Sequence, residues 1–173
     1  MLIVKVMSEV AKKAMSEDVR KPHKNRYYFF LNPYEDAAFT RCPKCESPTK
    51  LRKIALAIHI EPRQLVFINK LCRYCTKCEL IIAKKSKLES LMVSCCERMN
   101  PDVVGNDYIT VGTVSHKDWL DVKKAAIDNS EAAKHICIFK NILNFELVPG
   151  GWYPDNRKRR RIWANKRRLA VRN

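Results

Sequence analysis

Glycine and long apolar stretches are both scarce in this sequence. Only four of the 173 residues are glycine, whereas loops that cradle nucleotide phosphates use several closely spaced glycines. No apolar run approaches the roughly 20 residues of a membrane-spanning helix. The first ten residues have no basic flank before a short apolar run, as a signal peptide would. We therefore expect neither a phosphate-binding loop nor contact with a membrane.

Catalytic motifs are scarce as well. The chain contains no nucleophile-elbow sequence. Asp102, Asp107, His116 and Asp118 lie close together in the sequence, but their spacing matches no metal nuclease, and Asp118 already has the spacing of a helix cap. We therefore expect the protein not to be an enzyme.

Acidic residues are few compared with basic ones. The chain has 34 lysines and arginines against 18 acids, a formal net charge of +16, and residues 157–173 hold nine of the bases and no acid. Such an excess of one sign indicates a polyanionic partner, most often nucleic acid. The alternative is that the charge only keeps the protein soluble, but a surface of that kind normally mixes both signs.

Cysteine, by contrast, is abundant, with eight residues. Two pairs have metal-binding spacing, Cys42-Pro-Lys-Cys45 and Cys75-Thr-Lys-Cys78. Two such turns place four thiolates around one ion, in the closed tetrahedral site that Zn²⁺ favours. Cys72-Arg-Tyr-Cys75 is a competing pair, but Cys72 lies in the strand that leads into the turn. We therefore predict Cys42, Cys45, Cys75 and Cys78 as ligands of a structural zinc ion.

The remaining cysteines, Cys72, Cys95, Cys96 and Cys137, are expected to be free thiols. The chain is long and apolar enough to fold without disulfides, and half of its cysteines already stand at metal spacing. Together with the absence of a signal peptide, this predicts a reducing, cytoplasmic location.

The residues between the two cysteine pairs predict a β-hairpin. Apolar residues alternate with other residues over 53–60 at the period of a strand, residues 61–63 form a turn, and residues 65–71 return. Residues 80–82 form a closing strand. This order of knuckle, hairpin, knuckle and strand over residues 39–84 resembles the zinc-ribbon superfamily. The resemblance implies a three-stranded antiparallel sheet and a bound Zn²⁺, but no activity.

Three segments also resemble an uncharacterised bacterial family of zinc-ribbon proteins: RCPKC, TKLRKIALAIHIEP and NKLCRYCTKCELIIA.

Helices are predicted on both sides of the ribbon. Residues 2–19 carry a helical apolar stripe, and the aromatic run at 26–31 follows as a strand. Ser86 and Glu89 have the spacing of a capping box. The helix behind them has an apolar face that would pack on the ribbon: Leu88, Leu91, Met92, Cys95, Cys96 and Met99.

Asn100-Pro101 predicts the start of a further small lobe. We expect a strand at 107–115, a helix capped by Ser115 and Asp118, and a second helix that is capped by Ser130 and runs towards residue 143. The whole chain is thus predicted to be α+β: a zinc ribbon packed by helices, with a small α/β C-terminal lobe and a basic tail. The four predicted parts are 1–38 (helix and aromatic strand), 39–99 (zinc ribbon with packing helix), 100–154 (small lobe) and 155–173 (basic tail).

These features predict a non-catalytic zinc-ribbon protein that binds the phosphate backbone of DNA or RNA through a basic tail and a basic surface. The alternative is a structural or adaptor subunit of a larger ribonucleoprotein or effector complex, with protein subunits as partners. The predicted nucleic-acid contacts lie in the tail, where Trp163 interrupts the bases and can stack on a nucleobase. They are Arg157, Lys158, Arg159, Arg160, Arg161, Trp163, Lys166, Arg167, Arg168 and Arg172.

Overall fold

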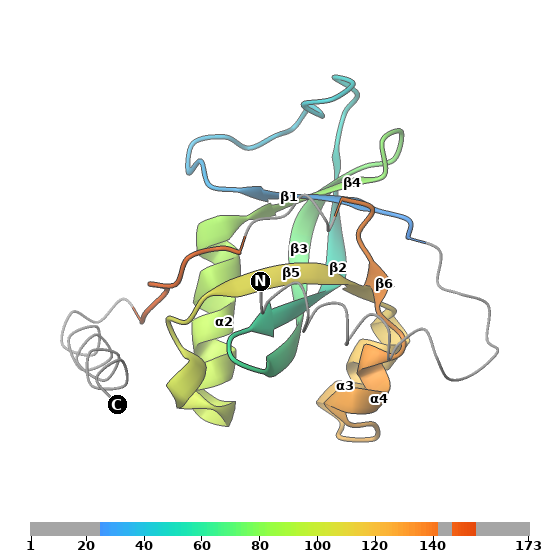
Figure 1. Ribbon diagram of the computed structural model, residues 1–173. Coiled ribbons are helices and arrows are strands. Elements are labelled where there is room, and N and C mark those ends of the chain that lie inside the picture. The colour runs from blue at the N-terminus through green and yellow to red at the C-terminus, as the bar shows by residue number, and fades with distance from the viewer. Residues whose placement is uncertain (1–24, 142–146, 155–173) are drawn as a thin grey trace.

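The computed structural model describes residues 25–141 and 147–154 (Figure 1). The helix predicted at residues 2–19 and the basic tail at 155–173 lie outside these ranges. The described elements are β1 (Tyr28–Asn32), β2 (Lys50–Ile60), β3 (Gln64–Cys75), β4 (Leu80–Lys84), α2 (Lys85–Met99), the 3₁₀ turn η1 (Pro101–Val103), β5 (Tyr108–Val114), α3 (His116–Lys123), α4 (Asn129–Ala133) and β6 (Cys137–Ile138).

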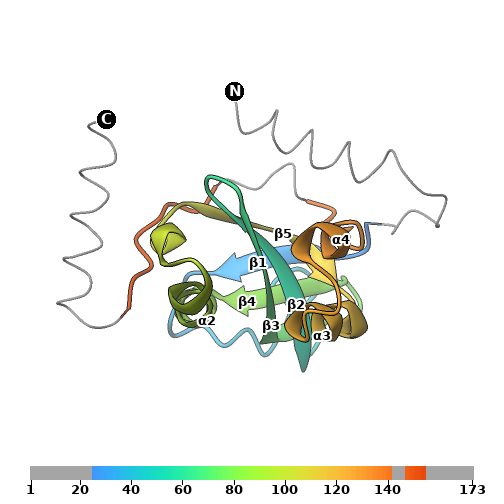
Figure 2. The ribbon, with the colours of Figure 1, turned by 90° about the horizontal axis from the view of Figure 1, so that it is seen from below.

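The strands form one curled sheet in the order β1-β4-β3-β2-β5-β6. The predicted hairpin is present, and β2 and β3 pair antiparallel along their whole length, from Lys50 opposite Tyr74 to Ile60 opposite Gln64. Because β3 and β4 pair over only three positions, the sheet can twist strongly there. Figure 2 accordingly shows β2 and β3 crossing the direction of β1 and β4 at a steep angle.

This sheet is larger than the predicted three-stranded antiparallel one. β5, which was assigned to a separate lobe, pairs antiparallel with β2 over residues 55–60, and β1 pairs parallel with β4. Residues 100–154 therefore extend the sheet of the hairpin instead of forming another. The physical reason is that β2 and β4 would otherwise leave backbone N–H and C=O groups unpaired at their edges.

The two faces of the sheet bury two different clusters. The larger core contains Leu56 and Ile58 of β2, with Phe29, Phe139 and Trp152 from distant parts of the chain. The smaller cluster lies on the other face of β3 and β4, around Cys42, Cys75, Leu80 and Ile82. The second face thus packs the metal-binding turns against the sheet.

The long helix α2 packs beside the hairpin, as predicted, but its caps and buried face differ from the prediction. It begins at Lys85, so Ser86 lies in its first turn and provides no cap. The hydroxyl of Ser86 instead hydrogen-bonds Glu35, and Glu89 accepts a hydrogen bond from the hydroxyl of Tyr108. The buried face consists of Leu88, Met92, Val93 and Cys96.

The predicted stripe was wrong at its edges, where Leu91 is 42% exposed and Met99 is 58% exposed. The buried face includes Val93, which the predicted stripe left out, so the face is rotated away from Leu91, and Met99 is the last residue of the helix.

The short helices α3 and α4 lie on the other side of the hairpin from α2 (Figure 1). The predicted cap of α3 is confirmed, because the hydroxyl of Ser115 accepts a hydrogen bond from the backbone N–H of Asp118. The predicted cap of α4 was wrong: Asp128 caps it instead of Ser130. The helix also ends at Ala133, because the following β-branched residues join the sheet as β6.

The free side of the edge strand β1 is occupied by one side chain. The amide of Asn141 donates to the carbonyl of Phe29 at 3.1 Å and accepts from its N–H at 3.2 Å. The backbone N–H of Lys140 donates to the carbonyl of Tyr27 next to it. The ring of Phe29 stacks on Phe139 at 4.8 Å between centroids. β1 is thus held from both sides by segments distant in sequence.

Candidate metal centre

The first cysteine turn is a compact loop closed by the backbone. The N–H of Cys42 donates to the carbonyl of Ser47 at 2.9 Å, and the N–H of Glu46 donates to the carbonyl of Cys42 at 2.8 Å. The hydroxyl of Thr49 donates to the carbonyls of Phe39 and Thr40 and so fixes the two arms of the loop. The loop therefore presents Cys42 and Cys45 on the same side.

The second turn repeats this arrangement. It begins inside β3, which runs as far as Cys75, and the N–H of Cys78 donates to the sulfur of Cys75 at 3.4 Å. In each turn the residue after the second cysteine is a glutamate in the left-handed region, with φ of 58° at Glu46 and 53° at Glu79. A residue other than glycine seldom adopts this conformation. Its presence at the same position in both turns shows that the two cysteine turns share this backbone feature.

The four predicted cysteines come together. The sulfurs of Cys42, Cys45, Cys75 and Cys78 all lie within 4.8 Å of one another, and those of Cys45 and Cys75 are 3.6 Å apart. Zinc–sulfur bonds of about 2.3 Å give sulfur–sulfur distances of about 3.8 Å in a tetrahedron. The tetrad therefore has the donor set and the dimensions to hold one metal ion.

The thiols of Cys45, Cys75 and Cys78 differ in acidity. Hydrogen bonds from Ser47 lower the pKa of Cys45 to about 6. Burial raises the pKa of Cys75, and the hydrogen bond with Cys45 is the main cause that raises the pKa of Cys78. One thiolate close to the others disfavours further negative charge. A cation at the centre offsets the repulsion between the thiolates, because its positive charge takes the place of the protons of all four thiols.

The pairing register explains why Cys72 is not part of the tetrad. Side chains alternate between the faces of a strand, so Cys72 and Cys75, three residues apart on β3, point to opposite faces. Cys72 is 1% exposed within the large core, where burial raises its pKa to about 11. Among the described residues, all eight cysteines are free of disulfide bonds.

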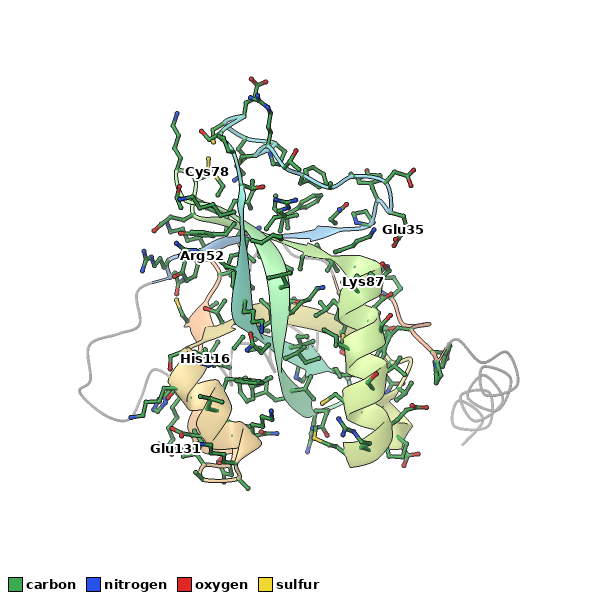
Figure 3. The ribbon with its side chains drawn as sticks, turned by 180° about the vertical axis from the view of Figure 1, so that it is seen from behind. Glu35, Arg52, Cys78, Lys87, His116 and Glu131 are labelled. Atoms are coloured by element: carbon green, nitrogen blue, oxygen red, sulfur yellow. The ribbon has the colours of Figure 1, made fainter. Side chains whose placement is uncertain are left out.

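Eight of the 19 bases of the described chain lie at this end of the molecule. We call residues 40–53 and 70–79 the basic end. It contains eight lysines and arginines but only two acids, Glu46 and Glu79. None of the eight forms an ion pair with an acid in the described part of the chain, where Glu79 is paired with Arg26 and Lys140. Figure 3 shows Cys78 at the opposite end of the molecule from Glu131 on α4.

Two polar groupings elsewhere lack the geometry of an active site. Asp118 hydrogen-bonds both Ser115 and His135. In a catalytic triad the histidine lies between the serine and the acid, whereas here the acid lies between the serine and the histidine. His59 and Glu61 have a His-x-Glu spacing, but they lie at the far end of the hairpin from the cysteines. At about 3.3 Å per residue, the nine residues from Lys50 to His59 span about 30 Å.

The residues predicted to contact nucleic acid, from Arg157 to Arg172, lie outside the described residues. The sequence also predicted a basic surface on the body of the protein, but not where on it the bases lie. The signal was available, because five bases occur from Arg41 to Lys53, in and around the first cysteine turn and along the start of the hairpin.

No helix within residues 25–141 and 147–154 has both the length and the apolar character needed to cross a bilayer. Comparison with known proteins adds no relative: no protein-family model, no curated protein and no solved structure matches this chain.

Proposed function

We propose that the protein is a non-catalytic zinc protein that binds the phosphate backbone of nucleic acid. Zinc is the ion that four thiolates at tetrahedral spacing favour, because it is soft enough for sulfur and has no competing geometric preference. All four positions are taken by cysteine, so the ion has no open site for a substrate. Its role in this proposal is to hold the two turns against the sheet.

The observation that carries the nucleic-acid part is the charge distribution around the tetrad. Arg41, Lys44, Lys50, Arg52 and Lys53 are exposed. They are mounted on a hairpin and a turn whose backbone is fixed by the hydrogen bonds described above. Exposed cations without acidic partners in the described chain are free to neutralise phosphates and to release their counterions. The tail, with its nine bases, would add flanking contacts of the same kind.

The folded part can be tested by a salt titration. Replacing Arg41, Lys44 and Lys50 by alanine should flatten the log–log salt dependence of binding by roughly two units on single strands and nearly three on duplex, since each contact contributes about 0.7 or 0.9. The matched control replaces three exposed bases far from the tetrad: Arg63, Arg98 and Lys124. Metal content is measured in both variants. Equal slopes for the two triple variants would contradict the role of the basic end.

The tail is tested by truncating the protein after residue 156. If about half of its nine bases engage phosphates, the truncation should flatten the salt slope by roughly three to four units. An unchanged affinity and slope would show that the tail does not bind nucleic acid.

A second candidate is a subunit of a larger ribonucleoprotein. It is favoured by two exposed leucines on the outer face of the hairpin, Leu51 at 55% and Leu71 at 52%. Leu51 pairs with Arg73 and Leu71 pairs with Lys53, so the two leucines are diagonal neighbours on one face of the β2–β3 ladder. A subunit would bind an isolated oligonucleotide only weakly and with a steep salt dependence, whereas a self-sufficient binder holds it at physiological salt.

A further inference from the structure

A pocket of about 200 Å³ opens beside the first half of β2. Its apolar floor includes Ile54, Ile81 and Val114, and its walls include Tyr27, Tyr74, Arg52, Lys53 and His116. In Figure 3, Arg52 and His116 lie on the same flank of the molecule, one at the start of the hairpin and the other at the start of α3. The pocket thus joins the basic end to the first turn of a helix.

The rim of this pocket is cationic. No acid lines it, and neither Arg52 nor Lys53 forms an ion pair with an acid among the described residues. The guanidinium of Arg52 lies 4.9 Å from the centre of the Tyr74 ring, which orients it without neutralising its charge. Consecutive residues of a strand point to opposite faces, so the guanidinium of Arg52, next to the Tyr74 ring, is the charge that faces the pocket. This charge favours an anionic group.

Part of the pocket lining is aromatic. The rings of Tyr27 and Tyr74 meet edge to face, with centroids 5.9 Å apart. Opposite them, the imidazole of His116 stacks on the ring of Trp119 at 5.5 Å. Flat rings around an apolar floor favour a flat partner, since stacking and the exclusion of water act together.

One residue of the pocket lining carries a hydroxyl. Thr113 lines the pocket and is only 5% exposed. Its backbone pairs with Leu56 of β2. A threonine hydroxyl can donate or accept a hydrogen bond, so it can pair with the polar edge of a ligand.

We propose that this pocket binds one nucleotide of a single-stranded nucleic acid, with its base against Tyr27 and its phosphate at Arg52. This inference rests on the proposed function and specifies the strand form. A base must leave its helical stack to enter a pocket, and only an unpaired base does so at low cost. Binding of phosphates alone, by contrast, requires no pocket.

The experiment compares two single strands of equal charge with the full-length protein. One is a ten-residue oligothymidylate, and the other is the same backbone without bases. The test variant is Tyr27→Leu, which removes the aromatic ring and keeps an apolar side chain. The control is Tyr34→Leu, a change at a tyrosine that is 63% exposed and does not line the pocket.

We expect Tyr27→Leu to weaken binding of the oligothymidylate about 5- to 150-fold, the range of one stacked base, and to leave binding of the abasic strand unchanged. Tyr34→Leu should change neither. If the intact protein binds both strands equally, or if the two variants behave alike, the pocket inference is overturned while phosphate binding stands. If neither strand binds at any salt concentration, the proposed function itself fails.

A second measurement needs no substitution and applies even if Tyr27→Leu does not fold. Thymidine monophosphate is titrated into the zinc-loaded protein while backbone amides are followed by NMR. The largest shifts should fall on Lys53, Thr113 and His116, and ribose phosphate should not reproduce them. Shifts that leave these amides untouched would overturn the proposal.

Discussion

We compare two variants, Cys78→Ser and Cys72→Ser. We expect Cys78→Ser to be the less stable of the two when metal is bound and the more stable of the two when metal is removed. Both changes replace one sulfur by oxygen. Cys78 is half-buried and belongs to the tetrad, whereas Cys72 is buried in the large core on the other face of the sheet. The pair therefore separates the contribution of the metal from that of packing within one strand–turn segment.

The magnitudes follow from these two environments. Cys72→Ser buries a hydroxyl in apolar surroundings and should cost about 1–3 kcal/mol whether or not metal is present. Cys78→Ser should cost little in metal-free protein. In the presence of metal it removes one of four ligands, and every 1,000-fold lost in the ratio of free metal to Kd removes about 4 kcal/mol of stability. Structural zinc sites contribute on the order of 10–16 kcal/mol of apparent binding energy. We therefore expect Cys78→Ser to lose several kcal/mol of unfolding free energy when metal is present.

The assay is urea unfolding of both variants, with added zinc and with chelator, alongside the metal content of each purified protein. We expect Cys78→Ser to be the less stable variant with zinc and the more stable one with chelator. The purified protein should hold about one zinc per chain, and Cys78→Ser clearly less. The ligand set would be refuted if Cys72→Ser lost the metal while Cys78→Ser kept it, or if chelator left the order unchanged.

Two further predictions concern the fold. Phe29→Ala should lower the free energy of unfolding by about 3–5 kcal/mol, because the ring is 4% exposed and stacked in the core. Tyr34→Ala is the matched exposed control, and urea unfolding that finds equal effects would contradict the assigned packing. Burial would raise the pKa of Asp118, but hydrogen bonds from Ser115 and His135 hold it below its ordinary value. Its stabilising effect is thus present above the unfolded pKa and lost as pH falls, so the destabilisation by Asp118→Asn should fade in acid; a pH-independent difference would contradict this.

The parts of the fold that the sequence predicted are those fixed by local spacing. The hairpin follows from a period of two between turn residues, and the meeting of the four cysteines follows from two short turns at the ends of paired strands. The cap at Ser115 needs only the three residues after it. In each case the partners are close in sequence or joined by a regular ladder, so a pattern of residue types was sufficient.

The parts that were missed depend on partners distant in sequence. The parallel pairing of Tyr28 with Leu80 leaves no periodic signal, because any apolar strand can fill the edge of β4. Ser86 had a valid capping pattern, but Glu35 takes its hydroxyl. The β-branched residues after Ala133 fit a strand or a helix face, and only the open edge of β5 decides between them.

The amide of Asn141 at the free edge of β1 has a consequence for self-association. An edge strand with exposed N–H and C=O groups is a template on which a second molecule can add a strand, and β1 has five residues in extended form, four of them apolar or aromatic. By occupying both backbone groups of Phe29, the second residue of the strand, the side chain interrupts the row of hydrogen bonds that an incoming strand would need. One asparagine thereby protects the aromatic edge against intermolecular β-pairing, a task that other proteins assign to a charge, a proline or a bulge.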